Sequence, residues 1–149
     1  MKKIRLTKEF HFEMAHALWN YDGLCRNIHG HSYVLEVTIM GEPISDENNP
    51  KLGMVMDFGE LKDIINKEII SQLDHSLVVN SKIPENQICN LAEISNNIIV
   101  VNYQPTCENL LIDFAQRLKK YFSAQTQLYS LKLRETANSY AEWFASDNI

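Results

Sequence analysis

Two segments limit what this chain can fold into, because apolar residues recur at nearly every second position in each of them. From Tyr33 to Ile39 every second residue is apolar, and a similar alternation runs from Ile4 to Met14. Successive side chains of a β-strand point to opposite faces, whereas a helix would spread these apolar positions around its circumference. The sequence therefore predicts two strands, each with one apolar face.

Three of the five histidines continue the apolar faces of these strands. His29 and His31 begin the face of the second strand, and His16 ends that of the first. If the strands pair, three imidazoles meet at one inward-facing point, the number of protein ligands with which a catalytic zinc keeps a fourth position open. A hydrogen-bonded core histidine explains one such position more readily than three, so the pattern favours metal binding. His11 has the opposite parity, and we expect it to face away.

Composition and charge exclude several classes of protein. With 149 residues, 45% of them apolar, the chain fits one domain over residues 1–149. It has no apolar run of membrane-spanning length and no signal-peptide pattern, and its three cysteines lack paired spacing, so we expect a cytoplasmic protein without membrane contact. The net charge of −5 and the lack of a basic run argue against nucleic acid as a partner.

Two helices are predicted from capping residues and apolar spacing. Asp57 caps the first helix, with Glu60 three residues later as in a capping box, and apolar residues recur at helical spacing as far as Leu73. Thr106 caps the second helix. The apolar stripe of that helix comprises Leu110, Leu111, Phe114, Leu118 and Phe122.

Further strands are predicted around the helices. A short strand is expected at residues 54–56 and another at Ile98–Val101, and two longer strands at residues 129–136 and 140–144 end the chain. The main order of strand, strand, helix, helix, strand, strand predicts an α+β fold, a four-stranded antiparallel sheet with both helices on one face. Its open edges and partly apolar outer face favour self-association.

Glu135 is a carboxylate in an apolar pattern. It continues the parity of Tyr129, Leu131 and Leu133, so it is expected to face inward and to need partners. Its two oxygens suit a pair of parallel N–H groups, such as the amino-pyrimidinone edge of a pterin or guanine. A salt bridge with a neighbouring cation explains the position equally well.

Cys25, the Asp74–His75 pair and Glu108 are the remaining candidates. Cys25 lies close to the histidine strand in sequence, and a metal ion nearby would favour its thiolate. A carboxylate beside an imidazole can orient it for proton transfer, although spacing alone favours a histidine that satisfies the last carbonyls of a helix. Glu108, at the start of the second helix, is expected to complement the helix dipole.

Six short motifs, taken in order, resemble those of one enzyme family. The motifs are Phe12–His16, Cys25–His31, Met56–Phe58, Leu73–His75, Pro105–Asn109 and Leu133–Thr136. Their order and spacing are similar to those of the 6-pyruvoyltetrahydropterin synthase and 6-carboxytetrahydropterin synthase family. The resemblance spans nearly the whole chain.

The resemblance implies a tunnelling fold, in which the sheets of several subunits join into a β-barrel and active sites form between subunits of a homo-oligomer, a hexamer or similar. The implied substrate is 7,8-dihydroneopterin triphosphate, whose side-chain hydroxyls would meet a zinc ion. The implied site residues are the zinc ligands His16, His29 and His31, the base Cys25 with its relay partners Asp74 and His75, and the pterin-binding residues Thr106, Glu108 and Glu135.

The spacing between Cys25 and His29 resembles that of the carboxy-forming enzymes of queuosine and deazapurine biosynthesis. These enzymes form 6-carboxy-5,6,7,8-tetrahydropterin, acetaldehyde and triphosphate. The alternative is the pyruvoyl-forming reaction, which eliminates triphosphate without breaking a carbon-carbon bond. A different class is a non-catalytic zinc protein in which Cys25 is a fourth ligand. The chain departs from the family pattern at Cys107, where serine is common, and in a longer segment over residues 83–104.

Overall fold

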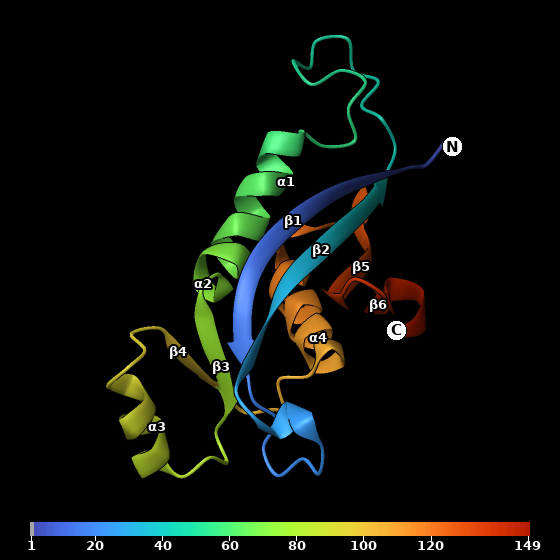
Figure 1. The fold of residues 1–149 in the computed structure, drawn as a ribbon. Helices are drawn as coiled ribbons and strands as arrows, with labels where there is room; N and C mark the ends of the chain where they lie inside the picture. Colours follow the sequence, from blue (N-terminus) through green and yellow to red (C-terminus); the bar gives the residue numbers. More distant parts are fainter. Residues whose placement is uncertain (1) are drawn as a thin grey trace.

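The centre of the fold is a mixed β-sheet whose long strands curve strongly (Figure 1). The computed structural model describes residues 2–149, and across them the sheet has six strands in the order β4-β3-β1-β2-β5-β6. The strands are β1 (Ile4–His16), β2 (His29–Gly41), β3 (Ser76–Asn80), β4 (Ile98–Val101), β5 (Thr126–Thr136) and β6 (Ser139–Phe144). The predicted antiparallel arrangement of β1, β2, β5 and β6 is confirmed. The predicted total of four strands is wrong, because β3 and β4 extend the sheet in parallel beyond β1.

The apolar face of β2 forms the middle of the core, as its alternation predicts. Four of its side chains, Tyr33, Leu35, Val37 and Ile39, are 0% exposed. Fully burying a large apolar side chain stabilises a fold by about 1.5–3 kcal/mol. The strand is therefore firmly held, and so are the histidines that begin it.

β3 is a strand that the sequence analysis missed. All five of its residues are buried, so buried and exposed positions do not alternate along the segment. From sequence, such a short buried strand cannot be distinguished from part of a buried helix. β3 pairs with β1 only at Met14, Ala15 and His16. Within the described part of the chain, the edge of β1 over residues 4–13 therefore has no strand beside it on that side.

The helices α1 and α4 cover one face of the sheet, behind β1 and β2 in the view of Figure 1. A continuous helical segment comprises α1 (Phe58–Ile65), a π-helical turn (Asn66–Ile70) and α2 (Ser71–Leu73), as predicted; α4 is Cys107–Leu118. Asp57 caps α1 by accepting from the Gly59 N–H at 2.6 Å. The predicted capping box is not formed, because Glu60 instead contacts Lys51 at 2.8 Å.

Two loop segments differ from the sequence-based prediction. No strand forms at residues 54–56, where Met54 instead bonds to Ile44 within an irregular loop. An unpredicted helix, α3 (Glu85–Ala92), connects β3 to β4; none of its residues is buried, so it lacks the core-facing stripe that reveals a helix in sequence. None of the helices in residues 2–149 is long and apolar enough to cross a membrane.

A bulge in β5 changes the predicted parity of that strand. Thr38 of β2 pairs with Ser130, but the next residue, Ile39, pairs with Leu128, so Tyr129 is the extra residue. Leu128 faces the core at 5% exposure. Tyr129 lies instead under the Arg5 guanidinium, 4.2 Å from its ring centre, so its predicted inward position is wrong.

Candidate functional site

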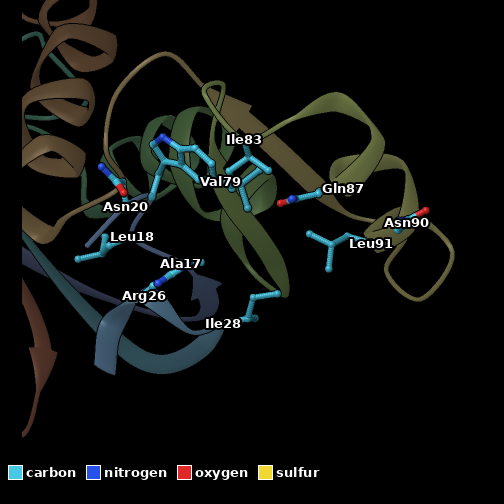
Figure 2. Close-up of a pocket in the computed structure, with 11 residues that line it drawn as sticks. Ala17, Leu18, Asn20, Arg26, Ile28, Val79, Ile83, Gln87, Asn90 and Leu91 are labelled. Carbon is cyan, nitrogen blue, oxygen red and sulfur yellow. The ribbon is translucent and has the colours of Figure 1, made fainter. Parts of the chain in front are cut away.

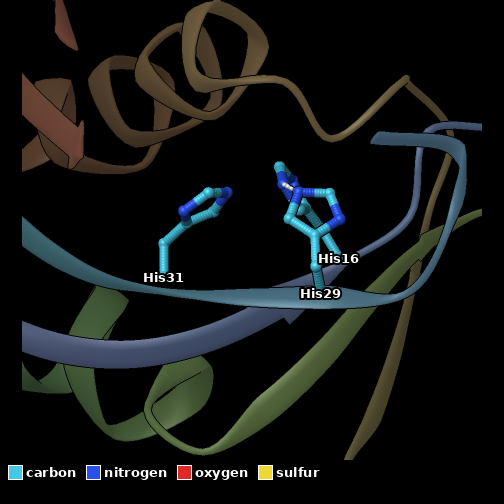
Figure 3. A group of neighbouring side chains, drawn as sticks. All are labelled: His16, His29 and His31. Carbon is cyan, nitrogen blue, oxygen red and sulfur yellow. Dashed lines mark hydrogen bonds between the residues drawn. The ribbon is translucent and has the colours of Figure 1, made fainter. Parts of the chain in front are cut away.

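The three histidines predicted as metal ligands meet at one end of the β1–β2 pair (Figure 3). The antiparallel register places His16 opposite His29, and His31 is two residues further along the same face. One nitrogen from each ring lies within 4.8 Å of the others. The convergence predicted from parity is confirmed for this histidine cluster. His11 lies away from it and contacts Glu9 at 2.8 Å on the exposed face.

Two backbone carbonyls determine which nitrogen of His16 and His29 faces the cluster. Nδ1 of His16 is 2.7 Å from the Pro105 oxygen, and Nδ1 of His29 is 2.7 Å from the Asn27 oxygen. Because a carbonyl only accepts, each Nδ1 must donate, and in the neutral ring the lone pair is then on Nε2. Burial lowers the pKa of His16, which favours that neutral form.

In their neutral forms, His16 and His29 direct unprotonated Nε2 atoms toward the cluster. The Nε2 atoms of His16 and His29 are 3.0 Å apart, so two lone pairs face each other unless a cation or an added proton lies between them. His31 Nε2 is buried without a hydrogen-bond partner in residues 2–149, a situation that costs about 1–3 kcal/mol. Divalent metal sites commonly use neutral imidazoles whose second ring nitrogen donates to a backbone carbonyl. The residues present therefore fit a metal ion held by three histidines.

A cavity of about 280 Å³, here called the histidine-side cavity, opens beside the cluster. It brings together predicted residues from four separate parts of the chain. Those residues are His16, Cys25, Thr106, Glu108 and Glu135. The predicted base and the predicted pterin-binding residues thus share one cavity with a candidate metal ligand.

Glu135 reaches the cluster from β5. Its Oε1 is 3.8 Å from His31 Nε2, and the buried Tyr33 hydroxyl donates to its Oε2 at 3.4 Å, a long hydrogen bond. The alternative expectation, a salt bridge between Glu135 and a neighbouring cation, is not met by Arg134 or Lys132. Arg134 donates to a backbone carbonyl, and Lys132 contacts Glu36. The carboxylate therefore keeps acceptor capacity toward the cavity.

Cys107, at the start of α4, is a neutral thiol beside this carboxylate. Burial, followed by the negative charge of Glu135, raises the pKa of Cys107 to about 12. Its Sγ donates to the Leu133 oxygen at 3.2 Å. Cys107 thus packs against β5 and holds its proton, as a small buried residue does.

The Asp74–His75 pair lies outside the histidine-side cavity, where the helical segment meets β3. Asp74 Oδ1 accepts from the backbone N–H of Glu13 at 2.9 Å, and His75 donates its own backbone N–H to the Glu13 oxygen at 2.6 Å. The first of these bonds lowers the pKa of Asp74, so its carboxylate stays ionised beside His75 Nδ1 at 3.1 Å. The two side chains form an oriented carboxylate-imidazole dyad.

The His75 imidazole points to the surface. Its side chain is 78% exposed, and its φ of 59° lies in the left-handed region that few residues other than glycine adopt. The reading of His75 as a helix-capping histidine is wrong, because the Ser76 hydroxyl donates to the last helical carbonyl, that of Leu73, at 2.6 Å. An exposed dyad held in a strained conformation is typical of a functional site.

A second and larger cavity, about 480 Å³, lies between residues 17–28 and α3 (Figure 2). We call it the α3-side cavity. Most of its lining is apolar, and of the residues that line it Arg26 alone is charged. It lies apart from the histidine cluster, whose members do not line it.

Two contacts at the site were missed by the sequence analysis. The Tyr33 hydroxyl could have been found, because Tyr33 continues the parity of the histidines and must place a polar group in the core. The Pro105 carbonyl leaves no signal in a sequence, since every residue has a backbone carbonyl. The contact exists because α4 begins beside the end of β1.

Comparisons with known proteins find relatives that match nearly the whole chain. The family described as 6-pyruvoyl tetrahydropterin synthase matches residues 5–146. The 6-carboxy-5,6,7,8-tetrahydropterin synthase of Haemophilus influenzae is 35% identical over 141 residues, covering 93% of this chain and 97% of that protein. The 6-pyruvoyl tetrahydrobiopterin synthase of Dictyostelium discoideum is 32% identical over 149 residues, covering 93% of this chain and 94% of that protein.

A solved structure shares the fold. The 6-pyruvoyl tetrahydropterin synthase of Caenorhabditis elegans matches with a TM-score of 0.68 and 25% identity, covering 97% of each chain. The sequence relatives and the shared fold extend over nearly the whole length of the chain. The chain therefore belongs to the 6-pyruvoyl tetrahydropterin synthase family.

Proposed function

We propose that this protein converts 7,8-dihydroneopterin triphosphate and water to 6-carboxy-5,6,7,8-tetrahydropterin, acetaldehyde and triphosphate, within queuosine or deazapurine biosynthesis. One observation carries the proposal: His16 of the histidine cluster, Cys25 and Glu135 line a single cavity, and no lysine or arginine in residues 2–149 pairs with the Glu135 carboxylate. The short spacing from Cys25 to His29, and the relative of that name at 35% identity, support the carboxy-forming reaction.

The metal in this proposal is zinc, held by the three histidines. Imidazole nitrogen suits zinc, and three protein ligands keep a fourth position for substrate. When bound, zinc supplies Lewis-acid chemistry toward the oxygens of the substrate side chain. The carbonyls of Pro105 and Asn27 keep the Nε2 atoms of His16 and His29 aimed at one point, so little reorganisation is needed on binding.

Glu135 and the start of α4 hold the heterocycle. The two carboxylate oxygens of Glu135 accept the parallel N–H groups of the pterin amino-pyrimidinone edge. The Thr106 oxygen already accepts from the Asn109 N–H at 3.3 Å, which leaves the Thr106 hydroxyl proton to donate to the ring. Glu108 lines the same wall, so the ring sits between α4 and β5.

Proton transfer is assigned to Cys25 with the Asp74–His75 dyad of a neighbouring subunit. Cys25 lines the cavity, whereas the dyad of the same chain lies outside it with His75 exposed. A second copy can supply the dyad, because the edge of β1 over residues 4–13 and the outer edge of β6 are open for strand pairing between subunits. Such pairing closes the sheets into a barrel and gives a homo-oligomer, a hexamer or similar.

Two other functions compete with this one. Elimination of triphosphate without carbon-carbon cleavage uses the same residues, and the Dictyostelium relative carries the name of such a synthase. A closed, non-catalytic zinc site would need Cys25 as a fourth ligand. Cys25 is exposed, and the cluster of ligand atoms found within residues 2–149 contains the three histidines without it.

Product analysis tests the proposal. The purified protein with zinc and dihydroneopterin triphosphate should release acetaldehyde and a compound with the mass of 6-carboxytetrahydropterin. A pyruvoyl product without acetaldehyde would establish the eliminating reaction instead. Unchanged substrate in the presence of zinc-loaded protein would refute both enzymatic functions.

A further inference from the structure

The loop that carries Cys25 has a cavity on each side. Cys25 lines the histidine-side cavity, and Trp19 and Arg26 line the α3-side cavity (Figure 2). Leu18 borders both. Because a cavity lies on each side, few packing contacts hold this loop. Its position relative to the histidine cluster therefore depends on hydrogen bonds.

Gln104 provides these bonds. Its Nε2 donates to the Trp19 backbone oxygen at 2.8 Å, and its Oε1 accepts from the Trp19 backbone N–H at 3.0 Å. One side-chain amide thus occupies both backbone groups of one residue, as a neighbouring strand would. Asn80 on β3 donates a further bond to Gln104 Oε1 at 3.1 Å, which fixes the amide in place.

The clamp reaches Cys25 through one more hydrogen bond. The backbone N–H of Leu18, the residue before the clamped Trp19, donates to the Cys25 backbone oxygen at 3.0 Å. The bond joins the two ends of the loop over residues 18–25. Holding Trp19 therefore also holds the backbone of Cys25.

The same segment also positions a metal ligand. Pro105, the residue after Gln104, accepts the Nδ1–H of His16. The Gln104 carbonyl in turn accepts from the Asn109 side chain at 3.0 Å, which ties the segment to the start of α4. The loop with Cys25 and the ring of His16 are thus both fastened to residues 104–105.

We propose that Gln104 is a positioning residue that keeps the Cys25 thiol aligned with the metal ligand His16. The catalytic consequence rests on the proposed function, which makes Cys25 the base. The clamp itself follows from the hydrogen bonds and can be tested without turnover. Pterin binding is expected to depend little on the Gln104 side chain, because Glu135 lies on β5 and the start of α4 is tied to the Gln104 backbone carbonyl, which a substitution retains.

The test uses Gln104→Leu, which removes both bonds to Trp19, and Gln104→Glu, which keeps the acceptor but faces the Trp19 carbonyl with a second oxygen. Gln127→Leu is the control, since the Gln127 amide also donates to a backbone carbonyl, that of Ala124, at 3.2 Å. Gln127 is exposed at the start of β5, away from the site. Zinc content and thermal unfolding of each variant show whether the fold is kept.

The first measurement is the rate at which iodoacetamide labels Cys25 in the metal-free protein, followed by peptide mass spectrometry. Cys89, exposed on α3, is the internal reference. We expect the ratio of Cys25 to Cys89 labelling to rise by about threefold or more in both Gln104 variants, because Cys25, although exposed, lines the histidine-side cavity, and a freed loop gives the reagent more directions from which to reach the thiol. The ratio should stay unchanged in Gln127→Leu.

The second measurement separates kcat from KM in the zinc-loaded enzyme. A misplaced base should lower kcat by about tenfold or more while KM stays within about twofold. Wild-type labelling ratios together with wild-type kcat in both Gln104 variants would overturn the proposal. If the wild-type protein shows no synthase activity, the proposed function fails, while the labelling ratio still decides whether the clamp exists.

Discussion

Glu135→Gln gives the most specific prediction about substrate recognition. The change keeps the shape of the side chain but replaces one acceptor oxygen with an NH₂ group, so one N–H of the bound pterin would face a donor. A hydrogen bond to a charged group contributes about 1.5–3 kcal/mol. No lysine or arginine in residues 2–149 forms an ion pair with the Glu135 carboxylate, so its charge is available to the ligand. A loss of about 2 kcal/mol corresponds to about thirtyfold weaker binding.

Isothermal titration with neopterin, at fixed zinc occupancy, measures this loss. Lumazine, which has an oxygen in place of the 2-amino group, provides a second ligand that offers Glu135 one N–H fewer. We expect Glu135→Gln to weaken neopterin binding far more than lumazine binding, with zinc content unchanged. Glu36→Gln is the matched control, because Glu36 contacts Lys132 at 3.7 Å on another part of the sheet. Neopterin affinity within twofold of wild type would show that Glu135 does not hold the ring.

Three further predictions concern proton transfer and acid stability. Cys25→Ala should keep about one zinc per chain while kcat falls by about a hundredfold or more; loss of zinc would instead support a four-ligand structural site. His75→Ala should be equally inactive, and mixed oligomers of Cys25→Ala and His75→Ala subunits should regain activity if the dyad serves a neighbouring subunit; no recovery would place both groups in one chain. Because the Glu13 N–H lowers the pKa of Asp74, its stabilising contribution is present above the unfolded pKa of about 3.9 and is lost as pH falls through the lower folded value. Acid unfolding should therefore show wild type more stable than Asp74→Asn at pH 6, with the difference shrinking below about pH 4.

The histidine cluster could be predicted because parity and one strand pairing are enough to define it. His16, His29 and His31 lie on core-facing positions, and an antiparallel pair joined by a loop of residues 17–28 brings them together. The same reasoning predicted that Glu135 faces the cavity, because Leu131 and Leu133 after the bulge at Tyr129 keep the core-facing parity that leads to it, although Glu135 itself is the extra residue at a second register shift opposite β6.

Other features leave no periodic signal. β3 is buried on both faces and α3 on none, so neither shows the alternation or stripe by which strands and helices are recognised. The position of Asp74 and His75 depends on where β3 meets β1, a parallel contact between residues far apart in sequence. Gln104 acts through backbone groups, which are the same in every residue.

The zinc content of histidine variants tests the metal centre most directly. Wild-type protein should bind about one zinc per chain, and His16→Ala, His29→Ala and His31→Ala should each lose most of it, because two imidazoles remain. His11→Ala is the control, since His11 lies on the exposed face and contacts Glu9; it should keep wild-type zinc. Full zinc retention with intact activity in His16→Ala would contradict the three-histidine site and the function built on it.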